Sequence, residues 1–171
     1  MTSVAEPGGL AVARVAVDDP RVRPLLTELA HEYQTRYGHD ARSELTRYPA
    51  AEFAPPHGAL LLLLEGGTAV AGGAFRRHQD PATAELKRIW THSAHRRRGL
   101  ARRVVAELER EAAARGYRRV FLTTGPRQPE ARGLYLATGY TPLFDLAADP
   151  ETIGPLPFEK HLTHPGKAPT R

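Results

Sequence analysis

The sequence contains no cysteine. This absence excludes disulfide bonds, cysteine-ligated zinc, iron–sulfur clusters and a mechanism that passes through a cysteine acyl-enzyme. Serine is scarce, and none of Ser3, Ser43 and Ser93 stands in a G-x-S-x-G pattern. The eight histidines include no H-E-x-x-H spacing. We therefore predict chemistry that uses neither a covalent intermediate nor a metal.

Long hydrophobic runs are also missing. No apolar stretch approaches the ~20 residues that a membrane-spanning helix needs. The first residues, MTSVAEPGG, lack the basic and apolar regions of a signal peptide. The sequence therefore predicts a cytoplasmic protein with no membrane partner.

The charge balance is basic, with 24 Lys and Arg against 19 Asp and Glu. A net charge of +5 favours anionic partners, and nucleic acid, a membrane surface and a phosphorylated cofactor all fit. At 171 residues the chain is expected to form one domain. We place this domain at residues 10–162, between disordered segments at 1–9 and 163–171.

The first half of the domain reads as strand, helix and hairpin. A helix is expected from Asp19-Pro20 to Gly38, because apolar side chains recur there at helical spacing. These side chains are Val22, Leu25, Leu29, Tyr33 and Tyr37. Strands are expected at 10–17, 59–65, 69–77 and 82–92, the last with alternating side chains. Residues 39–58 read as a loop with room for one short helix.

In the second half, helices and strands alternate. Leu100, Val104, Leu108 and Ala112 form one apolar stripe of a helix that Gly116 closes. The outer face of that helix carries Arg103–Glu107 and Glu111–Arg115 at i,i+4 spacing. A strand at 120–124, a helix from Pro129 to Gly139 and strands at 140–144 and 156–162 follow. The order predicts an α/β fold: a mixed sheet of about six to seven strands, flanked by helices.

The stretch HRRRGLA at 95–101 concentrates positive charge just before the second long helix. It fits a solvated turn, a nucleic-acid patch or a cradle for an anionic small molecule. A glycine at a helix N-terminus lets free backbone amides approach an anion. Against the nucleic-acid reading, the basic run is short, lacks interleaved aromatics and precedes Glu107, Glu109 and Glu111.

Two motifs then carry a family resemblance. Arg96-x-x-Gly99-x-Ala101 is similar to the Q/R-x-x-G-x-G/A loop with which GNAT N-acetyltransferases bind acyl-CoA. Residues 128–140, QPEARGLYLATGY, resemble the N-x-x-A-x-x-L-Y-x-x-x-G-F pattern of the same family. The chain departs from these patterns at four positions. Gln128 replaces asparagine, Ala101 the second glycine and Ser93 a proline, and Gly133 lies inside the helix.

The resemblance implies the GNAT fold, acetyl-CoA as cosubstrate and transfer of acetyl to a primary amine in a ternary complex. It assigns cofactor contacts to the backbone of Trp90 and Thr91, to the loop and to Gln128. The loop residues are Arg96, Arg97, Arg98, Gly99, Leu100 and Ala101. The strands are expected to separate after Thr91 and Thr123, so that the pantetheine arm can enter.

Glu85 matches the position of the family's general base, and Tyr135 that of its general acid. Each also has a purely structural alternative: Glu85 as a partner for Arg88 or another surface cation, and Tyr135 as an aromatic residue of the core. Tyr33, Tyr37 and Tyr48 are candidates for the wall of the acceptor pocket. A monomer or homodimer is expected. The rival readings are a non-catalytic acyl-CoA sensor and a basic nucleic-acid-binding module.

Overall fold

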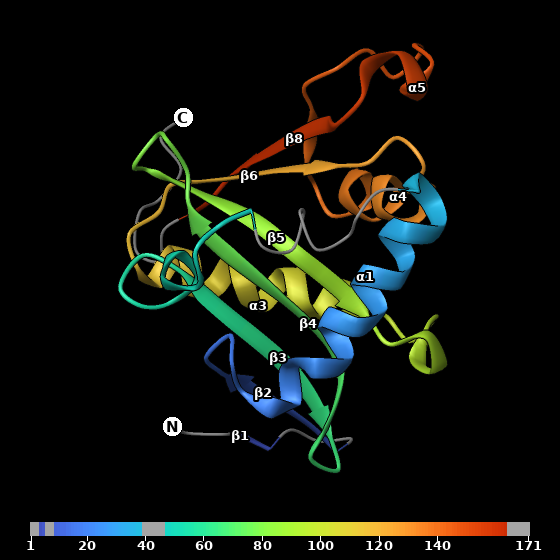
Figure 1. Cartoon of the computed structure of the whole chain (residues 1–171). Helices are drawn as coiled ribbons and strands as arrows, with labels where there is room; N and C mark the ends of the chain where they lie inside the picture. Colours follow the sequence, from blue (N-terminus) through green and yellow to red (C-terminus); the bar gives the residue numbers. More distant parts are fainter. Residues whose placement is uncertain (1–3, 6–8, 39–46, 164–171) are drawn as a thin grey trace.

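The computed structural model describes residues 4–5, 9–38 and 47–163. Eight strands form one sheet in the order β1-β2-β3-β4-β5-β6-β8-β7 (Figure 1). Only the β5–β6 pair is parallel, and all the other neighbours are antiparallel. The strands are β1 (Val4–Ala5), β2 (Leu10–Arg14), β3 (Ala59–Glu65), β4 (Thr68–Arg77), β5 (Thr83–Thr91), β6 (Arg119–Thr124), β7 (Thr141–Pro142) and β8 (Leu156–His161). The helices are α1 (Arg23–Tyr37), α3 (Leu100–Ala114), α4 (Pro129–Ala137) and α5 (Pro150–Ile153).

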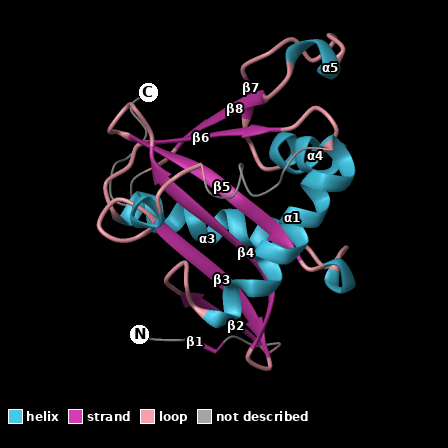
Figure 2. Ribbon diagram, viewed as in Figure 1, coloured by secondary structure: helices cyan, strands magenta, loops and turns pink. Residues whose placement is uncertain are grey.

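Helices α1 and α3 cover opposite faces of the sheet (Figure 2). The apolar run of β3 explains this arrangement, because successive side chains of a strand point to opposite faces. Leu61 and Leu63 join the core on the α3 side, which includes Leu108. Leu60 and Leu62 join a second core on the α1 side. The continuous hydrophobicity of this strand therefore reflects burial on both faces.

The structure confirms the predicted first helix, both in its apolar stripe and in the residue that ends it. Val22, Leu25 and Leu29 are buried, and Gly38 caps α1 in the left-handed conformation with φ 65°. The first turn is a 3-10 helix, Pro20–Val22, and the Asp19 side chain accepts a hydrogen bond from its second residue. The short helix expected within 39–58 is the 3-10 turn Ala50–Phe53, while residues 39–46 lie outside the described part of the chain.

Helix α3 also matches its prediction. Its apolar stripe is buried, and Gly116 follows its end with a positive φ of 90°. The two expected i,i+4 ion pairs form on its outer face, Arg103–Glu107 at 2.9 Å and Arg115–Glu111 at 3.0 Å. The stripe packs on the sheet, which fixes the position of the helix N-terminus relative to β5.

Several predicted boundaries are wrong. The strand expected at 10–17 ends at Arg14, because the chain turns there toward the Asp19 cap. The strand expected at 140–144 is only Thr141–Pro142; the Leu143 amide still donates to the Pro157 carbonyl, but Pro157 has no N–H to return the bond. Val4–Ala5 pairs with β2, within the segment predicted to be disordered. Short α5 was not expected, and residues 164–171 of the predicted tail are not described.

Strand β5 does not alternate as predicted, because it contains a β-bulge. Its register on β4 passes from Ala74–Lys87 to Gly72–Trp90. Two residues, Arg88 and Ile89, therefore oppose the single Gly73, and Arg88 takes a positive φ of 59°. A bulge re-aims the side chains that follow it. A Cβ at Gly73 would lie 2.6 Å from Cδ1 of Ile89, so a larger residue there would make that side chain shift.

Candidate active site

The parallel strands β5 and β6 separate soon after they meet. Their register contains only three pairs, from Thr83–Arg119 to Glu85–Phe121. Beyond that point the two strands diverge toward the end of the sheet where α1 and α4 lie (Figure 1). The separation begins six residues earlier on β5 than the Thr91 that we predicted. The last part of β5 therefore offers backbone groups that β6 does not use in this register.

The loop after β5 leads directly to the N-terminus of α3. It passes through the 3-10 turn Ser93–His95, and then Arg97 and Gly99 adopt left-handed conformations with φ 64° and 72°. Helix α3 begins at Leu100, so its first amides have no partner within the helix. A Cβ at Gly99 would meet nothing within 4 Å. Conformation, not space, therefore favours glycine at this position.

The three consecutive arginines do not form a uniform basic patch. All three are exposed, but Arg98 pairs with Glu65 at the end of β3 and contacts the ring of His95 at 2.8 Å. Its guanidinium is therefore engaged beside the β3–β4 hairpin. Arg96 and Arg97 remain on the loop itself. This division weakens the reading of the run as a nucleic-acid surface, which requires several cations on one face.

Glu85 lies in an ion-pair network on the α1 face of the sheet. Its side chain is 8% exposed, and its Oε1 accepts a hydrogen bond from Arg76 at 2.8 Å. Lys87 lies 3.5 Å from its other oxygen. Arg76 also binds Glu52 at 2.6 Å, and its guanidinium stacks 4.3 Å from the ring centroid of Tyr48. The structure thus brings together two of the predicted site residues, Glu85 and Tyr48.

Tyr135 lies in the core on the other face, among aromatic rings. Its ring centroid is 5.3 Å from that of Tyr140 and 5.8 Å from that of Phe158. Burial raises the pKa of the Tyr135 phenol far above its usual value, and nearby Tyr33 of α1 adds to the effect. Tyr33 also acts electrostatically on Arg88 at the bulge. Tyr33 thus acts electrostatically on two residues, Tyr135 and Arg88.

Tyr37 and Gln128 meet at the loop between β6 and α4. Oε1 of Gln128 accepts hydrogen bonds from the Gly125 amide at 2.9 Å and from the Tyr37 hydroxyl at 3.5 Å. The Arg127 amide donates to that hydroxyl at 3.3 Å. A Cβ at Gly125 would lie 1.9 Å from the Tyr37 oxygen. Tyr37 therefore supports the loop between β6 and α4. The three tyrosines predicted for the acceptor pocket, Tyr33, Tyr37 and Tyr48, lie in three different parts of the structure.

Glu28 and Arg88 also lie near the predicted site residues but were not predicted from the sequence. Glu28 of α1 accepts hydrogen bonds from Trp90 and Ser93 at 2.6–2.9 Å. Arg88 is partly buried, and burial lowers the pKa of its guanidinium. It lies 4.6 Å from the ring centroid of Phe53. No motif marks either residue. A glutamate beside the apolar stripe of a helix is usually interpreted as a solvent-facing charge, and a β-bulge has no simple sequence pattern.

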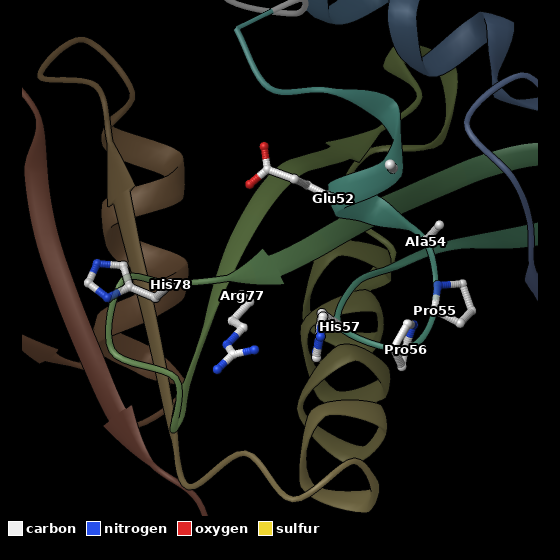
Figure 3. A pocket seen from close by; sticks show the side chains of 8 residues that line it. Glu52, Ala54, Pro55, Pro56, His57, Arg77 and His78 are labelled. Atoms are coloured by element: carbon white, nitrogen blue, oxygen red, sulfur yellow. The ribbon is translucent and has the colours of Figure 1, made fainter.

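A cavity of about 340 Å³ opens at the end of the sheet where β4 stops (Figure 3). Its lining residues are Ala51, Glu52, Ala54, Pro55, Pro56, His57, Arg77 and His78. None of them belongs to the 96–101 loop, so this cavity is not the place for an anion held by that loop. It adjoins the Glu85 network through Glu52 and Arg76.

Two absences hold for the described residues. Residues 4–5, 9–38 and 47–163 contain no group of three or more His, Asp or Glu side chains arranged to hold a metal ion. Among the helices described, none combines the length and the apolar character needed to cross a bilayer.

Known proteins resemble this chain in both sequence and fold. The acetyltransferase (GNAT) family matches residues 23–140. A Bacillus subtilis (strain 168) protein named uncharacterized N-acetyltransferase YsnE is 33% identical over 92 residues, which cover 51% of this chain and 61% of the relative. The match therefore spans less than two thirds of that relative.

Two solved structures illustrate the likeness in fold. An acetyltransferase from Streptococcus agalactiae 2603 superposes with a TM-score of 0.71 at 18% identity, over 91% of this chain and 100% of the other. The PaiA N-acetyltransferase from Thermoplasma acidophilum, solved in complex with coenzyme A, gives 0.67 at 13% identity, over 89% and 98%. These likenesses confirm the predicted fold. Since the family match covers more than half of the chain, the protein belongs to the acetyltransferase (GNAT) family.

Proposed function

We propose that the protein transfers an acetyl group from acetyl-CoA to a primary amine, by direct attack within a ternary complex. One observation carries the proposal: the pairing of β5 with β6 ends at Glu85, and the unpaired part of β5 leads into the 96–101 loop and the first amides of α3. An extended chain that ends in a pyrophosphate fits such a path. The resemblance in fold to the PaiA enzyme, solved with coenzyme A, supports the same choice of ligand.

The residues of this path fit the cofactor. The amides around Gly99, Leu100 and Ala101 would hold the pyrophosphate, because they are unpaired at the helix N-terminus and the helix dipole adds positive charge. Exposed Arg96 and Arg97 would attract it, whereas Arg98 would first have to leave Glu65.

The arm of the cofactor would follow the open edge of β5. The backbone of Trp90 and Thr91 would hold it there, beyond the last β5–β6 pair. We assign Gln128 mainly to the shape of the β6–α4 loop, with its Nε2 as the atom that would meet the cofactor.

Glu85 is the proposed general base. The acceptor amine has a pKa of about 10 and must lose a proton before it attacks a thioester. Glu85 lies at the last β5–β6 pair, where the opening begins, and on the α1 face. Arg76 fixes Oε1, so the carboxylate is oriented. Oε2, 3.5 Å from Lys87, is the atom that would take the proton, directly or through a water molecule.

Tyr135 is proposed as the hydrogen-bond donor to the leaving sulfur. Acetyl-CoA supplies the activated thioester, and a free thiol has a pKa of about 8.5. Because burial raises the pKa of Tyr135, its phenol stays protonated and gives up its proton less readily than a thiol does. Tyr135 therefore stabilises the departing thiolate by a hydrogen bond and keeps its own proton. The raised pKa is the reason for proposing this role in place of the full proton transfer that the resemblance implied.

Two measurements test the proposal. Calorimetry with acetyl-CoA should show one site per chain and a melting temperature that rises with ligand concentration. Turnover should then appear with at least one amine in a panel of polyamines, amino acids, aminoglycosides and peptide N-termini. Binding without turnover would favour the sensor. No binding at millimolar acetyl-CoA, together with salt-sensitive DNA binding, would favour the nucleic-acid module.

A further inference from the structure

Glu28 connects helix α1 to the segment that carries the cofactor loop. Its Oε1 accepts hydrogen bonds from Nε1 of Trp90 and from the amide of Ser93, both at 2.9 Å. Its Oε2 accepts a third from the Ser93 hydroxyl at 2.6 Å. All three donors belong to the end of β5 and the 3-10 turn that follows it. One carboxylate therefore holds both sides of the point where the strand becomes the loop.

These three hydrogen bonds, called the Glu28 clamp below, are made to an ionised carboxylate. Burial raises the pKa of the Glu28 carboxyl, but the bonds from Ser93 and Trp90 outweigh it and hold the pKa below its usual range. Hydrogen bonds to an ionised acceptor are shorter and stronger than neutral ones. A glutamine at this position could keep two bonds to its Oε1 and donate from its Nε2 to the Ser93 hydroxyl, but every bond would lose the charge of the carboxylate.

The clamp acts where the loop geometry is set. Ser93 begins the turn that leads, within six residues, to Gly99 and the first amides of α3. An anion cradle requires several amides to converge on one point, so its affinity depends on the exact path of the backbone. Arg98 ties the far side of the loop to Glu65, but through exposed side chains. The anchor with several bonds, one of them from the buried Trp90, is at Glu28.

We propose that Glu28 is a positioning residue for acetyl-CoA. It acts through Ser93 and Trp90, and it preorganises the pyrophosphate loop without touching the cofactor. Preorganisation of this kind removes part of the ordering cost of binding. The inference rests on the proposed function, because it assumes that this loop binds acetyl-CoA. It also links the loop to α1, the helix that carries Tyr33.

The test measures acetyl-CoA affinity in the full chain. Trp90 is the only tryptophan, so its emission reports both binding and the bond from Nε1. Glu28→Gln should weaken acetyl-CoA binding about tenfold, as expected when charge-assisted bonds become neutral ones. The matched control is Glu32→Gln, one turn further along α1, where the carboxylate pairs with Arg36. That variant should bind within about twofold of the wild type.

A second variant separates positioning from general loosening. Ser93→Pro removes the amide and hydroxyl donors together, and His92 already has the extended ψ of 137° that a following proline requires. If Glu28 acts in part through Ser93, then Glu28→Gln should weaken binding by a smaller factor in the Ser93→Pro background than in the wild type, with the remainder due to Trp90. Circular dichroism confirms folding of each variant.

Acid titration of Trp90 emission gives a further readout. The wild type should show a transition as Glu28 protonates below pH 4.5, the ordinary value, and Glu28→Gln should not. The proposal is overturned if folded Glu28→Gln binds like the wild type, or if its effect is undiminished with Ser93→Pro. A wild type that binds no acetyl-CoA at millimolar concentration refutes the proposed function itself.

Discussion

Glu85 and Arg76 face each other across β4 and β5, with Oε1 of Glu85 2.8 Å from a guanidinium nitrogen of Arg76. The same guanidinium binds Glu52 at 2.6 Å. Two carboxylates therefore share one cation, but only Glu85 lies at the strand opening. This asymmetry allows a base to be distinguished from a structural partner, because the two glutamates can be exchanged for glutamine separately.

Glu85→Gln should lower turnover by about 10²-fold or more, the usual contribution of a general base. The loss should be largest at low pH, where most of the acceptor amine is protonated. In the variant, the logarithm of the rate should rise with pH until the amine pKa of about 10, since solvent must then remove the proton. Steady-state rates between pH 6 and 10 provide the measurement.

The control for this prediction is Glu52→Gln. It removes the other partner of Arg76 and should keep the wild-type shape of the pH profile. If both variants lose activity equally and neither changes the profile, Glu85 serves the ion-pair network and another group, or water, is the base.

Tyr135→Phe should lower kcat by about 10²-fold or more, while the dissociation constant for acetyl-CoA stays within a few-fold. The substitution removes only the donor to the leaving sulfur and keeps the ring contacts with Tyr140 and Phe158. Because the pKa of Tyr135 is raised, the wild-type rate should show no alkaline loss from this residue below about pH 10.

Tyr140→Phe is the matched control in the same ring cluster. The Tyr140 hydroxyl donates to Glu109 at 2.8 Å, so its loss should affect stability and leave kcat unchanged. A Tyr135→Phe enzyme with a normal rate would assign Tyr135 to packing alone.

The limits of the sequence analysis follow from the range of the interactions. The two cores were predictable, because the stripes of Val22, Leu25 and Leu29 and of α3 repeat at helical spacing. The turn at HRRRGLA was predictable from one glycine before a helix, but its role as a cofactor loop was implied only by the family resemblance. These signals are local, and each lies within a few residues of the feature that it predicts.

The bulge at Arg88 and the clamp of Glu28 could not be predicted, because both depend on partners far along the chain. The register of β5 on β4 places Arg88 in a bulge, so the side chains of β5 do not alternate between the two faces there. No local sequence pattern predicts this register. Glu28 meets Trp90 across 62 positions in sequence. The early separation of β5 from β6 also involves two strands that are far apart in the sequence, because helix α3 lies between them along the chain.

Gly133→Ala should stabilise the protein by about 0.5–1 kcal/mol. Gly133 lies inside α4, where glycine costs this amount relative to alanine because its unfolded chain is freer. A Cβ there would meet nothing within 4 Å. Urea unfolding should show a higher midpoint at the same slope. A lower midpoint would mean that α4 needs this glycine for something that its surroundings do not show.

Gly99→Val should abolish acetyl-CoA binding in a chain that remains folded, whereas Arg96→Ala, Arg97→Ala and Arg98→Ala should each weaken it only a few-fold. The reason lies in the backbone: φ at Gly99 is 72°, which a β-branched residue strongly disfavours, so the loop must move away from the path that aims the amides. Each arginine is exposed, and an exposed charge pair contributes about 0–1 kcal/mol. Arg98→Ala should be the mildest, since its guanidinium already pairs with Glu65.

Dissociation constants at low and high salt decide whether the arginine side chains or the backbone amides supply most of the affinity. The effects of the arginine substitutions should shrink with salt, and the effect of Gly99→Val should not. Normal binding by folded Gly99→Val would remove the backbone cradle and, with it, the main support for the proposed acetyl-CoA site.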